Sequence, residues 1–209
     1  MMTNGDDETG VSRDDLVQRV ALMETMIAEG RRATTRFGWI FVLWGAVDLF
    51  GIGWQSMREH SYWVWPITLT GGGVLQLIGI KVLCGTSHAC GTSVQSRSIS
   101  TVWSMMGIGT LLYVASAIAS HLSWQVSYLS AILMMVGLAH AISAGLLRWA
   151  AQGVVAALWW IGGVAMFFVP WNYRVGIFTA EMFLGFFCFG LYAMMLDRKT
   201  AATTVPRHG

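Results

Sequence analysis

Two carboxylates inside long apolar runs are the residues best placed to do chemistry. Asp48 lies in the run of residues 37–54, and Glu181 lies in the run of residues 175–196. A charged group at the centre of a membrane helix costs about 2.5–3.5 kcal/mol on insertion scales, so each carboxylate needs a reason to be there. The two runs are expected to be antiparallel, so the end of the first and the beginning of the last reach the same outer boundary of the membrane. Each carboxylate lies six residues from that boundary, which places both about 9 Å below it.

Equal depth makes contact between Asp48 and Glu181 feasible if their two helices are neighbours. Two nearby carboxyls in a low-dielectric interior would share a proton. Such a pair could relay protons, bind a cation or coordinate a metal. The competing interpretation is that each carboxyl is protonated or hydrogen-bonded and only fixes helix packing.

Two further polar side chains lie within apolar runs. Gln76 follows Gly71–Gly73 in the run of residues 62–83, where the glycines allow another helix to approach closely or the helix to bend. His140 lies in the run of residues 124–147, and a neutral imidazole with one hydrogen bond to a neighbouring helix would account for it. The candidate intramembrane polar site therefore comprises Asp48, Glu181, Gln76 and His140.

One short motif resembles a metal site, but only weakly. Cys84, His88 and Cys90 form C-x3-H-x-C, whereas structural zinc takes four ligands at tighter, paired spacings. No fourth ligand is evident, so the sequence predicts neither a metal nor another cofactor. The chain also lacks a Ser/His/Asp order, a phosphate-binding loop, a dinucleotide fingerprint and HExxH, which predicts no catalytic residues.

The elements that position these residues follow from composition. Hydrophobic residues make up 55% of the 209-residue chain and charged residues only 11%, against about 25% charged in soluble domains. A soluble domain could not hide so much apolar surface, so lipid must solvate much of the chain. The net charge of +2 gives no argument for nucleic-acid binding.

The sequence predicts an all-α integral membrane protein with six transmembrane helices in three antiparallel hairpins. Each apolar segment is close to the ~20 residues that cross a bilayer as a helix. A polar loop is expected over residues 84–100. The predicted organisation is a disordered tail at 1–11, a cytoplasmic amphipathic helix at 12–35, a membrane domain at 36–197 with spans at about 37–54, 62–83, 101–120, 124–147, 150–169 and 175–196, and a cytoplasmic tail at 198–209.

The predicted N-terminal helix has one apolar stripe. Leu16, Val20, Met23 and Ile27 follow a 4-3-4 spacing, which places them on one helix face. This face could pack on the membrane or on the cytoplasmic ends of the spans. It could also form a short dimeric coiled coil, although only about two heptads are available.

The distribution of basic residues predicts the orientation. With the N-terminus in the cytoplasm, nearly all Lys and Arg residues fall inside, and only Arg58 and Arg174 fall outside. The positive-inside rule therefore favours a multi-pass protein of the cell inner (plasma) membrane with both termini cytoplasmic. Trp54, Trp63, Trp124 and Trp171 fall at the outer ends of spans, as an interfacial aromatic belt should.

Several stretches resemble a loose set of uncharacterised six-span bacterial inner-membrane proteins. They are the basic helix end Arg31–Trp39, the Leu43-Trp44-Gly45 step, Gly145–Arg148 and Trp159–Phe168. The resemblance implies the same architecture and a bacterial origin. That set has no established activity, so the resemblance implies no site residue.

Three classes of function are compatible with the sequence. The favoured class is a non-enzymatic accessory, sensory or assembly subunit that acts through helix contacts with itself or another membrane protein. The second is a small ion- or proton-coupled transporter or channel that uses Asp48 and Glu181. The third is a membrane-embedded enzyme acting on lipid or quinone. It is the least favoured because His140 is expected in the opposite half of the bilayer from both carboxylates.

Overall fold

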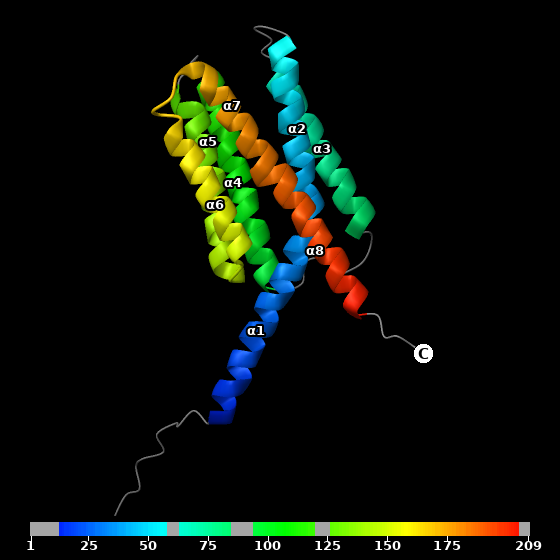
Figure 1. Ribbon diagram of the computed structural model, residues 1–209. Helices are drawn as coiled ribbons and strands as arrows, with labels where there is room; N and C mark the ends of the chain where they lie inside the picture. The colour runs from blue at the N-terminus through cyan, green and yellow to red at the C-terminus, as the bar shows by residue number, and fades with distance from the viewer. Residues whose placement is uncertain (1–12, 58–62, 85–93, 120–125, 205–209) are drawn as a thin grey trace, which may run out of the picture.

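The computed structural model describes residues 13–57, 63–84, 94–119 and 126–204, and within these ranges all regular structure is helical (Figure 1). This confirms the predicted all-α class. The helices are α1 (Arg13–Arg36), α2 (Gly38–Met57), α3 (Val64–Cys84), α4 (Val94–Ala119), α5 (Val126–Leu147), α6 (Ala150–Ala165), α7 (Trp171–Glu181), the π-helical segment η1 (Met182–Cys188) and α8 (Phe189–Thr204).

The number of helices that meet the requirements for a membrane span is smaller than the six predicted. Within the described residues, three stretches are long and apolar enough: Arg13–Met57, Leu129–Leu147 and Asn172–Lys199. Helix α6 is apolar but shorter. It ends early because the chain tightens after Ala165, where the Phe167 and Phe168 amides bond carbonyls three residues back, ahead of Pro170, a residue type that ends helices.

Helix α4 also differs from its predicted bounds. It begins at Val94, inside the region predicted as a polar loop. Ile99 in its second turn is buried, and α1 packs against α4. The early start of α4 is therefore stabilised by a packing partner that local composition does not reveal.

The helices form two groups, and the last helical segment of the chain contacts both. Helices α4, α5 and α6 pack together, as do α2 and α3. The segment α7–η1–α8 contacts α5 and α6 through α7 and then α2 through η1 and α8, crossing between the groups in Figure 1. Glycines allow the closest approach, because a Cβ on Gly190 would meet the backbone of Gly38, and one on Gly45 would meet the backbone of Phe187.

The turn between α5 and α6 carries an unusual backbone conformation. Arg148 has a φ of +48°, in the left-handed region where glycine normally ends a helix. The amide of Trp149 donates to the carbonyl of Ala144 at 3.1 Å. The hydrogen bond closes the end of α5, and only two residues separate α5 from α6.

Several helix ends that carry basic residues lie on the same side of the molecule. The end of α3, the beginning of α4, the α5–α6 turn and the end of α8 all lie on the side from which α1 projects (Figure 1). These are the segments that carry Lys81, Arg97, Arg148 and Arg198. The fold therefore gathers on one side basic residues that the positive-inside rule predicts to be cytoplasmic.

Candidate functional site

Asp48 is buried on α2, whereas the carboxyl of Glu181, at the end of α7, faces α6. Asp48 has 8% of its surface exposed, and α2 packs against η1 and α8. The carboxyl of Glu181 instead lies against Gly162 of α6. Among the described residues no hydrogen bond joins the two carboxyls, and Oε2 of Glu181 is buried without a partner. The proton-sharing pair stays a prediction.

Gln76 connects two helices. Its Oε1 accepts a hydrogen bond of 2.6 Å from Nε1 of Trp44 on α2. Gly72 and Gly79 on the same helix lie against Val47 and Trp39 of α2. The contacts support the interpretation that Gln76 fixes the packing of α2 on α3.

His140 occupies the centre of an aromatic cluster. Its ring is fully buried, and neither ring nitrogen has a hydrogen-bond partner among the described residues. The expected hydrogen bond to a neighbouring helix is therefore wrong. The reason is that aromatic rings from five other segments surround the imidazole: Phe41 of α2 at 5.7 Å, Trp103 of α4 at 4.8 Å, Trp159 of α6 at 6.3 Å, Phe186 of η1 at 6.3 Å and Phe189 of α8 at 5.3 Å between ring centroids.

Two more buried polar side chains have no hydrogen-bond partner in the part of the chain that the structure describes, and neither belongs to the polar site predicted from the sequence. They are Trp159, through its Nε1, and Gln152, through both amide atoms. Trp159 fits against Gly185 of η1, where a Cβ would collide with its indole ring. For Gln152, a polar residue near the beginning of an otherwise apolar helix was the available signal.

Two of the side chains with buried polar atoms lie where α6 packs against the segment α7–η1–α8. Gly162 of α6 meets Glu181, and one turn away Trp159 meets Gly185. Trp159 in turn stacks on His140, with an angle of 17° between the rings. Unpartnered polar atoms therefore run from Glu181 through Trp159 to His140 beside a π-helical segment, a feature that is frequent at functional sites.

The weak metal motif lies largely outside the described residues. His88 and Cys90 are not described, and nothing is assigned to the side chain of Cys84. Among the side chains that the structure does describe, no group of three or more His, Cys, Asp or Glu residues could hold a metal ion.

Helix α1 forms a second candidate site, on the outside of the molecule. Its first half projects away from the other helices (Figure 1), and every described side chain from Arg13 to Thr25 is exposed. The exposed fraction is 53–62% for five apolar side chains: Leu16, Val17, Val20, Leu22 and Met23. Leu16, Val17, Val20 and Met23 share one side of the helix, whereas Leu22 lies on another side. Isolated exposed apolar residues are ordinary, but a set on one side of a helix is typical of an interaction surface.

The second half of α1 is fastened to the other helices. Gly30, Thr34 and Thr35 are buried. Nε of Arg31 donates to the carbonyl of Leu147 at 2.6 Å, and Nη2 donates to the carbonyl of Arg148. A guanidinium at the carbonyl end of a helix is favourable because it satisfies open acceptors and complements the helix dipole. The projecting half is therefore held at a fixed angle.

No protein-family model matches the chain, and neither a curated protein nor a solved structure is similar to it at a significant level.

Proposed function

We propose that the chain is a six-span protein of a bacterial inner membrane, with both termini in the cytoplasm. The spans would be α2, α3, α4, α5, α6 and the segment α7–η1–α8. The gathering of basic helix ends on the side of α1 supports this orientation, because cytoplasmic loops are rich in Lys and Arg. Helix α6 would span about 24 Å, and a segment this short can be accommodated by local thinning of the bilayer.

Within that architecture we propose a non-enzymatic accessory or assembly role. The observation that carries the proposal is the projecting half of α1 with its exposed apolar side chains. Helix α1 continues directly into α2, with the Phe37 amide bonded to the carbonyl of Ala33 at 3.0 Å. An arm with this direction leaves the bilayer instead of lying along it, which favours a protein partner that buries the apolar face.

Site-specific photo-crosslinking in native membranes tests this role. A photoreactive side chain at Val20, on the apolar stripe, should give one discrete adduct with a protein. The same group at Gln18, on the opposite face of α1, is the matched control and should give little adduct. Equal labelling from both positions, or adducts with lipid alone at Val20, would contradict a protein-binding face.

A second candidate function is proton- or cation-coupled transport. The observation that favours it is the run of unpartnered polar atoms at Glu181, Trp159 and His140. Such atoms are costly in a membrane interior, and ionisable ones there commonly mark transport pathways. In proteoliposomes loaded with a pH-sensitive dye, Glu181→Gln should abolish a proton flux that Lys81→Gln leaves intact. Absence of flux in the parent protein would eliminate this candidate.

A further inference from the structure

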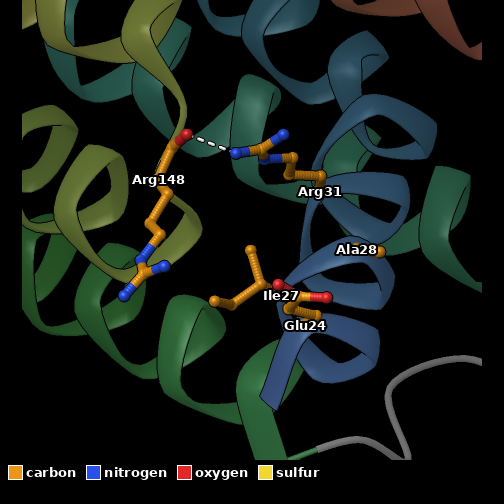
Figure 2. Close-up of a pocket in the computed structure, with 5 residues that line it drawn as sticks. All are labelled: Glu24, Ile27, Ala28, Arg31 and Arg148. Carbon is orange, nitrogen blue, oxygen red and sulfur yellow. Dashed lines mark hydrogen bonds between the residues drawn. The ribbon is translucent and has the colours of Figure 1, made fainter. Parts of the chain in front are cut away.

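A surface cavity of about 240 Å³, open on one side, lies between α1 and the α5–α6 turn (Figure 2). It is lined by Glu24, Ile27, Ala28, Arg31 and Arg148. The lining carries two guanidinium groups and one carboxylate, so its net charge favours an anion. In Figure 2, Ile27 stands between the side chains of Glu24 and Arg148.

The side chain of Arg148 is the group available to a ligand. Arg31 already donates hydrogen bonds from Nε and Nη2 to the carbonyls of Leu147 and Arg148. Arg148 takes part in that contact through its backbone oxygen, while its own guanidinium extends along the cavity (Figure 2). Arginine is suited to phosphate because its planar fork can donate two parallel hydrogen bonds.

The backbone supplies an independent observation. Arg148 keeps a φ of +48° at a helix end where glycine would be free of strain. A residue held in a sparsely populated conformation points to a requirement for its side chain. Arg31 already satisfies the helix end, so the requirement lies with the guanidinium in the cavity.

The position of the cavity identifies the source of the anion. Arg148 lies between the ends of two apolar helices, and Ile27 and Ala28 add an apolar wall. Under the proposed orientation this is the boundary between the hydrocarbon and the cytoplasm. Basic pockets on that side of membrane proteins suit anionic lipid headgroups. A free phosphate would need no apolar wall.

We propose that this cavity binds the phosphate of an anionic phospholipid of the cytoplasmic leaflet, with Arg148 as the principal ligand. The inference rests on the proposed six-span orientation but not on the partner of α1. Because residues of both α1 and the α5–α6 turn line the cavity, the bound lipid would help to hold α1 against this turn.

Thermal unfolding of the purified full-length protein in detergent, with defined additives, tests the proposal. Phosphatidylglycerol should raise the Tm of the parent by about 2–4 °C, the size expected for a ligand at several times its Kd. Phosphatidylcholine should raise it less. Inorganic phosphate and glycerol 3-phosphate should have little effect. An equal shift with the soluble phosphates would assign the site to a soluble anion and overturn the lipid.

The decisive variant is Arg148→Gly, because glycine adopts a φ of +48° freely and the protein should fold at least as well without lipid. Phosphatidylglycerol should no longer raise the Tm of Arg148→Gly. Arg148→Lys should keep part of this Tm increase. Arg19→Gln, on the projecting half of α1, should keep all of it. A full shift in Arg148→Gly would overturn the proposal. Photo-crosslinking from Val20 reports separately on the partner of α1, so loss of either result leaves the other interpretable.

Discussion

At the scale of single residues, glycines decide which large side chains can be buried. Trp159 and Glu181 each occupy the space that a Cβ would need on the facing helix, at Gly185 and Gly162 respectively. Buried membrane-helix interfaces rely on such small residues for close packing. The tryptophan and the carboxylate can be inside only because their neighbours have no side chain.

Gly185→Ala should therefore destabilise the protein by about 1–3 kcal/mol, as overpacking does in cores. The added methyl group would collide with the buried indole ring of Trp159. The matched control is Gly176→Ala in α7, where a Cβ meets nothing and the change should be neutral or stabilising by up to about 1 kcal/mol. Unfolding by SDS titration, followed by Trp fluorescence, measures both. Equal effects would show that Trp159 is not held in this position.

The Trp44–Gln76 hydrogen bond should be worth about 0.5–2 kcal/mol, the range measured for interhelical bonds in membranes. A double-mutant cycle with Trp44→Phe and Gln76→Leu measures the coupling energy between the two side chains, because each change removes one of the two hydrogen-bonding groups. A coupling energy near zero would mean that packing of α2 on α3 does not depend on this bond.

The unusual polar residues could be selected from the sequence, but their partners could not. Asp48, Gln76, His140 and Glu181 stand out because ionisable and amide groups are rare in apolar runs. Whether such a group finds a partner depends on which helices are neighbours, and this is not encoded locally. His140 shows the difference, because its surroundings come from five other segments.

At the scale of elements, the lengths of the apolar segments predicted most helices to within a few residues, and hydrophobic periodicity predicted the N-terminal helix. These patterns did not predict the π-helical segment, because Met182–Cys188 has the same composition as an ordinary apolar helix. Nor did they predict the early start of α4, which depends on contact with α1. Both features are set by packing against other helices, so no local pattern reveals them.

Arg31→Ala should lower stability by about 1.5–3 kcal/mol, since it removes two charge-assisted hydrogen bonds at the end of α5. Arg32 is the next residue but is exposed, so Arg32→Ala should change stability by about 0.5 kcal/mol or less. Amide hydrogen exchange adds a local measurement, with faster exchange expected in Gly30–Arg36 for the Arg31 variant. If both variants behave alike, the contact does not fasten α1.

At the scale of the whole molecule, the fold depends on α7–η1–α8. This segment contacts both helix groups, whereas a chain of three independent hairpins would need no such crossing. Equal depth in the sequence suggested that the first and last apolar segments could meet, and α2 does pack on η1 and α8. The direction of the Glu181 carboxyl toward α6 could not be anticipated, because depth does not define which face of a helix meets which neighbour.

The proposed orientation predicts opposite accessibility for the two ends of the molecule. In a variant lacking the native cysteines, Thr25→Cys on α1 should react with a membrane-impermeant maleimide only after cells are permeabilised. Trp63→Cys, an exposed position next to the start of α3, should react in intact cells. Labelling at position 25 in intact cells would reverse the orientation.

The projecting half of α1 gives the molecule a mechanical lever. The projecting half, residues 13–25, is about 20 Å long at a rise of about 1.5 Å per residue. A bend of ~10° at the point where the projecting half leaves the fastened half would move its tip by roughly 3 Å, enough to break or make a side-chain contact.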